Sequence, residues 1–184
     1  MRKLTILVDM DDTIENLLDR WLDLLNERYG LDKKRDDITD WAMGQFFPGI
    51  PEEELLNVEQ EKGFWDEVKP IEGAVEGLKK LIDDGHEVYI VTNASYQGLR
   101  ERMDNCLFKY FPYLKWKNVI VTTNKHLIKG DVLIDDALHN HAGGEYKHIL
   151  MDAPYNRSFD AEAAGYVRVH NWSEILDEID RLAR

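Results

Sequence analysis

Acidic, hydroxyl and amino side chains follow three short runs of β-branched and aliphatic residues, at the positions where strands are predicted to end. The first run leads into Asp9-Met10-Asp11-Asp12-Thr13, the second into Thr92-Asn93, and the third into Asp135-Asp136, which Lys125 precedes in a short loop. Ligands of open parallel sheets bind outside the carboxyl ends of the strands. If these strands are parallel, the carboxylates, the hydroxyl and the ammonium converge on one rim, where we expect a catalytic or ligand-binding site.

Each of these residues, taken alone, also has a purely structural interpretation. Asp and Thr are common in turns, and Thr92 suits a strand. Asp135 and Asp136 have the residue type of a helix cap, and Lys125 that of a solvated surface charge. The coincidence of all of them at strand ends favours the functional interpretation.

The overall charge limits the classes of partner. The 184-residue chain has 23 Lys and Arg against 36 Asp and Glu, a net charge of -13, which argues against a broad surface for a nucleic-acid polymer or an anionic membrane. An anionic ligand therefore needs a local positive group. A single cysteine, Cys106, forms no internal disulfide and is expected to be inert. The first apolar run stops at Asp9, too early for a signal segment, so we expect a cytoplasmic protein.

Short strands alternating with helical stripes predict an α/β fold with a parallel sheet and helices on its faces. One helical stripe covers residues 74–82 and is followed by Gly85 as its capping glycine, and a last helix is expected after Ser173 as its N-cap. The predicted strands are residues 4–8, 88–92, 119–122, 132–134, 149–151 and 166–169.

Residues 16–70 interrupt this alternation, because they contain helical stripes and loops but no convincing strand. A first helix is expected from Leu17 to Tyr29, and the polar run 32–37 predicts a loop after it. An insertion at this position leaves the sheet at the carboxyl end of the first strand, so we expect residues 16–70 to form a helical cap over the site. The core domain would then comprise residues 1–15 and 71–184.

Asp9-x-Asp11-x-Thr13, Thr92, Lys125 and Asp135-Asp136, in this order at strand ends, resemble the four motifs of the haloacid dehalogenase-like phosphohydrolases. The segments 70–75, 122–125 and 131–136 and the late Asn171-Trp172 resemble the 5′(3′)-deoxyribonucleotidase branch of that superfamily. The resemblance implies a Rossmann-like parallel sheet sandwiched by helices, with a small inserted cap.

The resemblance also implies roles in phosphoryl transfer. Asp9 would attack phosphorus and form an aspartyl-phosphate, and Asp11 would act as general acid toward the leaving alcohol and then as general base for water. Thr92 and nearby backbone N–H groups would hold the phosphate, with Asn93 beside it. Lys125 would neutralise Asp9 and the transferring group.

A Mg²⁺ ion is the implied cofactor, because it prefers oxygen ligands. By resemblance, the side chains of Asp9 and Asp135 and the backbone carbonyl of Asp11 supply them, with Asp136 behind or through water. The summed negative charge of the phosphate and the aspartates exceeds the summed positive charge of Mg²⁺ and Lys125. We therefore expect Asp11 to start the reaction protonated, because like charges nearby disfavour its ionisation.

Aromatic residues of the cap are the only sequence clue to a nucleobase, because aromatic faces stack on bases. The same residue types also build the core of a small helical cap, so both interpretations stay open. The candidates for the substrate wall are Trp41, Phe46, Phe47, Phe64 and Trp65.

Lys129 and the pair His139 and His141 offer competing assignments. Lys129 also precedes Asp135, but the spacing of Lys125 fits the resembled branch better. His139-x-His141 has no acidic partner at metal-ligand spacing, so surface or capping histidines are favoured over a zinc site.

The favoured function is a Mg²⁺-dependent phosphomonoesterase that acts on (deoxy)nucleoside monophosphates, as a monomer or a homodimer. One alternative is a phosphatase of a phosphosugar or another small metabolite. An alternative of another class is a phospho-accepting signalling module similar to receiver domains. Such modules lack a cap of this size after the first strand.

Overall fold

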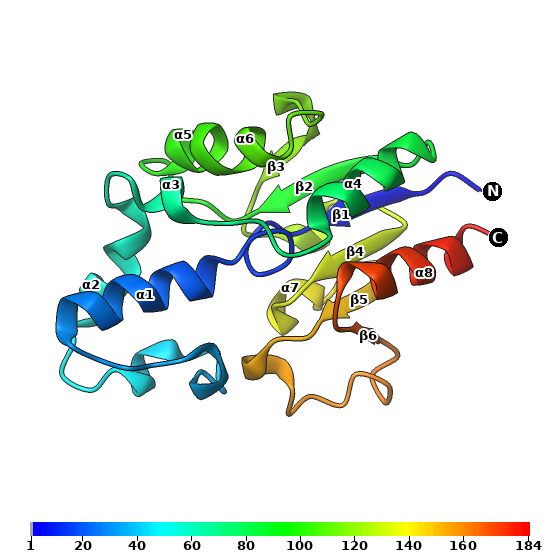
Figure 1. Cartoon of the computed structure of the whole chain (residues 1–184). Coiled ribbons are helices and arrows are strands. Elements are labelled where there is room, and N and C mark those ends of the chain that lie inside the picture. Colours follow the sequence, from blue (N-terminus) through cyan, green and yellow to red (C-terminus); the bar gives the residue numbers. More distant parts are fainter. Residues whose placement is uncertain (1) are drawn as a thin grey trace.

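The computed structural model describes residues 2–184 and contains a six-stranded sheet in the order β3-β2-β1-β4-β5-β6, in which every neighbouring pair is parallel (Figure 1). The α/β prediction is confirmed, and the strand ends differ from the predicted ones by one or two residues. The strands are β1 (Thr5–Val8), β2 (Glu87–Thr92), β3 (Val119–Val121), β4 (Val132–Asp135), β5 (Lys147–Met151) and β6 (Val167–Val169).

The central strand β1 is buried on both faces of the sheet. Ile6 and Val8 join the large hydrophobic core, whereas Leu7 belongs to a small cluster with Val91 and Leu133 on the other face, as the period of two requires. Val8 lies beside Ile90 of β2 and Ile134 of β4 in the register. The residues that follow these positions therefore leave the sheet at the same rim.

The helices vary from single turns to thirteen residues. The α-helices are α1 (Leu17–Tyr29), α2 (Glu52–Asn57), α3 (Phe64–Glu67), α4 (Ala74–Asp83), α5 (Leu99–Glu101), α6 (Phe108–Tyr110), α7 (Leu138–His141) and α8 (Trp172–Leu182). The short helices of other types are η1 (Arg35–Asp37), η2 (Met43–Phe46), η3 (Val58–Gln60), η4 (Arg102–Leu107), η5 (Trp116–Asn118), η6 (Lys125–Leu127) and η7 (Pro154–Asn156), of which η4 is a π-helix.

Helices α4 and α8 lie side by side on the large-core face of the sheet (Figure 1). Gly85 follows the end of α4 with a φ of 89°, as the capping prediction requires. The N-cap of α8 is Asn171 rather than the predicted Ser173. The Asn171 side chain accepts a 3.0 Å hydrogen bond from the Glu174 N–H, so the helix begins at Trp172.

The segment between β1 and α4 contains α1, α2, α3 and short helical turns, and lies beyond the carboxyl ends of the central strands (Figure 1). Helix α1 covers the predicted range and buries Leu18, Leu22 and Leu25 on one side. The polar run that was expected to be a loop contains the single turn η1. Within residues 2–184, no helix is both long and apolar enough to cross a membrane.

Candidate active site

Lys125 joins two of the strand-end aspartates. Its Nζ donates hydrogen bonds to Asp9 Oδ1 and, at 2.6 Å, to Asp135 Oδ2, and the Lys125 side chain is only 1% exposed. Burial opposes the ammonium charge, but Asp9 and Asp135 together raise the pKa of Lys125. Burial, only partly opposed by Lys125, raises the pKa of Asp9 to about 7. The ammonium therefore balances only part of the negative charge at this rim.

The carboxylates of Asp9, Asp135 and Asp136 could hold a metal ion. One oxygen from each lies within 4.8 Å of the others, and all three residues are buried. Burial, reinforced by the charges of Asp135 and Asp9, raises the pKa of Asp136 well above its usual range. One ammonium is too little positive charge to keep three buried carboxyl groups ionised, so the site favours a further cation. This all-oxygen donor set fits a divalent metal ion.

Neighbouring groups hold the side chains of Asp135 and Asp136 in place by hydrogen bonds. Asp135 Oδ1 accepts hydrogen bonds from the Ala137 N–H at 2.9 Å and from Asn140 Nδ2 at 3.0 Å. Asp136 accepts hydrogen bonds from Tyr155 Oη and, at 3.4 Å, from Thr13 Oγ1. These contacts fix the carboxylate orientations before any ligand binds.

Asp11 is paired with a residue that the sequence analysis did not identify. Arg102 Nη2 lies 2.5 Å from both carboxylate oxygens of Asp11 and 2.5 Å from Thr92 Oγ1. One guanidinium nitrogen therefore brings a positive charge against the Asp11 carboxyl group. The protonated starting state of Asp11 stays a prediction.

Asp12 connects the loop after β1 to the inserted segment. Its carboxylate accepts a 2.7 Å hydrogen bond from Arg35 Nη2 and two from the Leu18 N–H at 3.2 and 3.3 Å. Asp12 has a φ of 50°, unusual for a residue other than glycine. Burial raises the pKa of Asp12 to about 6, although the Arg35 guanidinium opposes this shift.

Glu15 is fully buried next to this loop, and neither of its carboxylate oxygens has a hydrogen-bond partner among the described residues. Burial, followed by the negative charge of Asp11, raises the pKa of Glu15 well above its usual range. Burial without a hydrogen-bond partner thus favours the uncharged form of Glu15.

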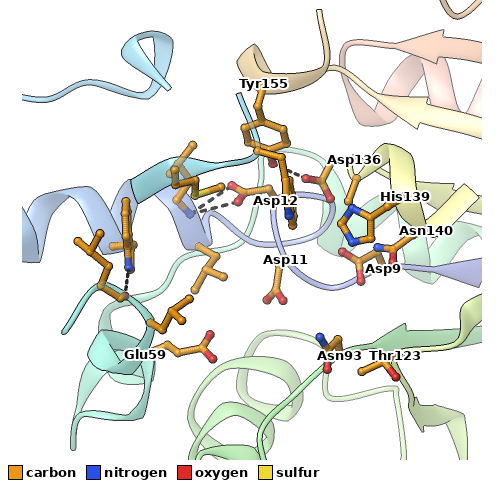
Figure 2. Close-up of a pocket in the computed structure, with 18 of the residues that line it drawn as sticks. Asp9, Asp11, Asp12, Glu59, Asn93, Thr123, Asp136, His139, Asn140 and Tyr155 are labelled. Atoms are coloured by element: carbon orange, nitrogen blue, oxygen red, sulfur yellow. Dashed lines mark hydrogen bonds between the residues drawn. The ribbon is translucent and has the colours of Figure 1, made fainter. Parts of the chain in front are cut away.

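A cavity of about 670 Å³ opens beside these residues and is bounded on the other side by the inserted segment. Asp9, Asp11, Lys125, Asp136 and Asn93 line it, and Figure 2 shows the Asp11 carboxylate directed into the space between Glu59 and Asn93. The inserted segment contributes an apolar wall made of Leu17, Leu18, Trp21, Met43, Leu55 and Leu56. The cavity therefore has an acidic end at the sheet and a mostly apolar wall on the inserted segment, to which Glu52 and Glu59 add carboxyl groups.

Trp41 is the one predicted cap aromatic that lines this cavity. It is 50% exposed and contacts His139 and Tyr155 edge to face, with ring centroids 4.8 and 5.3 Å apart. Trp21 and Tyr155, which the sequence analysis did not select, also line the cavity.

The other four predicted aromatics, Phe46, Phe47, Phe64 and Trp65, do not line the cavity. Phe47 is 2% exposed and packs edge to face on Trp21, and Phe64 and Trp65 pack on each other with centroids 5.4 Å apart. Phe46 is half-buried against the same core. These side chains fill the interior of the inserted segment, so the core interpretation describes their position.

Several other predicted residues are also placed by the structure. Thr92 is buried and does not line the cavity, since its hydroxyl contacts Arg102. Lys129 is exposed, in contrast to Lys125. His141 Nε2 lies 3.1 Å from the backbone oxygen of Asp135, and Cys106 is buried.

The fold of the chain is that of the haloacid dehalogenase-like hydrolases. A hydrolase of this class from Deinococcus radiodurans R1, solved with phosphate and sodium, superposes with a TM-score of 0.63 at 18% identity, covering 96% of this chain and 95% of that chain. A magnesium-bound hydrolase of the class from Bacillus subtilis superposes with a TM-score of 0.58 at 19% identity, covering 98% and 100%. At these identities the likeness shows the fold.

The chain belongs to the family described as 5′ nucleotidase, deoxy (pyrimidine), cytosolic type C protein, whose model matches residues 2–184. A 5′(3′)-deoxyribonucleotidase from Bacillus subtilis strain 168 is 32% identical over 175 residues, covering 94% of this chain and 96% of that protein. The expected family is thereby confirmed. The chain is a phosphoric monoester hydrolase, and its substrate is a small phosphate monoester.

Proposed function

We propose that this protein is a Mg²⁺-dependent 5′(3′)-deoxyribonucleotidase that hydrolyses (deoxy)nucleoside monophosphates. The observation that carries the proposal is the buried bridge of Lys125 between Asp9 and Asp135, with Asp11 two residues beyond Asp9 at the same rim. The relative from Bacillus subtilis supports the nucleotide as substrate. In this proposal residues 16–70 are the cap that covers the site.

The first half of the reaction is the attack of Asp9 on phosphorus. Lys125 occupies Asp9 Oδ1, which leaves Oδ2 to form the bond to phosphorus while the bond to the ester oxygen breaks. Asp11 donates a proton to the departing alcohol. Asp11 recovers this proton from water in the second half of the reaction.

The second half hydrolyses the aspartyl-phosphate. Ionised Asp11 takes a proton from water, which attacks phosphorus and releases phosphate and the Asp9 carboxylate. The Lys125 ammonium stabilises negative charge throughout both steps. Mg²⁺, held by Asp9, Asp135 and Asp136 and the Asp11 backbone carbonyl, would supply further positive charge at the phosphate when bound.

The nucleoside is proposed to lie in the apolar half of the cavity. Trp41 presents an exposed ring there, and stacking on a base contributes about 1 to 3 kcal/mol. Trp21 and Leu55 form the wall on the α1 and α2 side. A sugar phosphate would leave this apolar surface uncovered, so the geometry favours a nucleotide.

Steady-state assays on a panel of phosphate esters with Mg²⁺ test the proposal. We expect deoxynucleoside monophosphates to have a higher kcat/KM than sugar phosphates, and Asp9→Asn to reduce turnover to background. Trp41→Ala should lower kcat/KM for nucleotides by about 10-fold, the equivalent of one stacking contact. Higher kcat/KM for sugar phosphates, or a folded protein that is inactive on every ester, would contradict the proposal.

A further inference from the structure

Arg102 is a buried arginine at the start of η4, between the catalytic rim and the inserted segment. It is 2% exposed, and its guanidinium makes hydrogen bonds in three directions. Nη2 contacts Asp11 and Thr92 Oγ1, Nη1 donates to the Asn93 backbone oxygen at 3.2 Å, and Nε lies 3.4 Å from Met10 Sδ. One planar group therefore connects the loops that follow β1 and β2.

The inserted segment holds the same guanidinium from the other side. The Trp65 ring centroid lies 4.8 Å from the Arg102 Cζ atom, in a cation–π contact. The Trp65 indole N–H donates a 2.9 Å hydrogen bond to the Glu59 backbone oxygen, which fixes the ring. Trp65 therefore acts on the position of Arg102, although it does not line the cavity.

Burying an arginine this deeply is costly unless its contacts compensate the charge. Asp11, whose carboxyl group contacts the guanidinium directly, is the main group that raises the pKa of Arg102 against the effect of burial. A lysine supplies the charge but has neither the planar fork nor the flat face that Trp65 contacts. The site therefore depends on the guanidinium shape as well as on its charge.

We propose that Arg102 is a positioning residue that holds the Asp11 carboxyl group against the end of β2, so that Asp11 can reach the leaving-group oxygen. This inference rests on the proposed function. Asp11 and Thr92 come from neighbouring strands and have no hydrogen bond to each other among the described contacts, so Arg102 provides their common anchor. The residue acts through Asp11 and does not itself contact the substrate.

Two esters with different leaving groups separate this role from a structural one. The alcohol of deoxythymidine 5′-monophosphate needs a proton to leave, whereas p-nitrophenolate leaves without one. The constant kcat/KM reports the first chemical step, in which the leaving group departs. We expect Arg102→Lys to lower kcat/KM for the nucleotide by about 10- to 100-fold, part of the about 10²- to 10⁴-fold value of a general acid. For p-nitrophenyl phosphate the change should stay within about 3-fold.

The controls come from the same turn of the chain and from Asp11. Arg100 lies two residues away and its side chain is 92% exposed, so Arg100→Lys should leave both esters unaffected. Asp11→Asn should show the same ester-selective loss as Arg102→Lys, and the double variant should lose little more than Asp11→Asn alone. If Arg102→Lys is not folded by its thermal transition, neutral Arg102→Gln replaces it with the same expectation.

Three results would overturn the inference. Equal loss for both esters in a folded Arg102 variant would show a general structural role. Unchanged kcat/KM for the nucleotide would show that Asp11 needs no such anchor. Additive losses in the double variant would show that Arg102 does not act through Asp11. A wild-type protein that is inactive on both esters would instead contradict the proposed function itself.

Discussion

Binding of a divalent cation is expected to stabilise the folded chain. Asp9, Asp135 and Asp136 bring three carboxyl groups into one buried space, where the Lys125 ammonium stabilises the ionised forms of Asp9 and Asp135. A divalent ion would supply two further positive charges and favour the ionised form of all three. Because the unfolded chain does not assemble this site, the binding free energy adds to the free energy of unfolding.

The size of the effect follows from linkage. An ion at 100 times its dissociation constant adds about 2.7 kcal/mol to the free energy of unfolding. A domain of this length gains about 2 to 4 °C in Tm for each kcal/mol. We therefore expect saturating Mg²⁺ to raise the Tm by about 5 to 11 °C.

The assay is calorimetry or dye-monitored melting after treatment with a chelator, with MgCl₂ titrated at constant ionic strength. Asp136→Asn preserves the side-chain shape and removes the carboxyl group that would ionise on binding Mg²⁺, so it should lose most of the Mg²⁺-induced shift. The matched control is Asp104→Asn, whose carboxylate is 56% exposed, and it should keep the full shift. A wild-type Tm that does not respond to Mg²⁺, or an equal response in Asp136→Asn, would refute the charge argument.

Three further predictions concern buried groups away from the substrate. Burial raises the pKa of Cys106 to about 12, so about one thiol in 10⁴ is ionised at pH 8. Iodoacetamide should therefore label Cys106 only as fast as the chain unfolds. Rapid labelling of the folded protein would contradict this prediction. Because the pKa of Glu15 is raised on folding, the folded chain binds its proton more tightly and stability falls as pH rises above the unfolded value. In urea titrations, Glu15→Gln should reduce this fall of the free energy of unfolding with pH and raise that free energy at pH 8 by about 1 to 3 kcal/mol. An unchanged dependence on pH would contradict this prediction. Gly77→Ala would place a Cβ 2.4 Å from Trp172 Cε3, so its urea midpoint should fall by the equivalent of about 1 to 3 kcal/mol; a midpoint at or above wild type would show that the helices adjust freely.

The sheet was predictable because its strands are short runs of apolar, mostly β-branched residues between clear helical stripes. The strand ends shifted slightly, since Lys147 pairs in β5 although its residue type does not favour a strand. The start of α8 was misplaced because Asn171 and Ser173 both suit an N-cap, and only the local backbone decides between them.

The aspartates and Lys125 were predictable because parallel strands bring their carboxyl ends together. Arg102 was not, because it lies among charged residues that have the composition of a solvated helix, and its partners are distant in sequence. The positions of Phe47 and Trp65 were open for a related reason. An aromatic side chain suits either a cavity wall or the interior of a small helical unit, and only packing decides.

The pair of Asp12 and Arg35 has a consequence for protein engineering. Asp12 lies in the turn after β1, and its carboxylate accepts hydrogen bonds from the Leu18 N–H in the first turn of α1 and from the Arg35 guanidinium of η1. Grafting a different inserted segment onto this sheet to change substrate choice would therefore disturb the turn after β1 as well. A successful chimera must carry both members of the pair from the same parent.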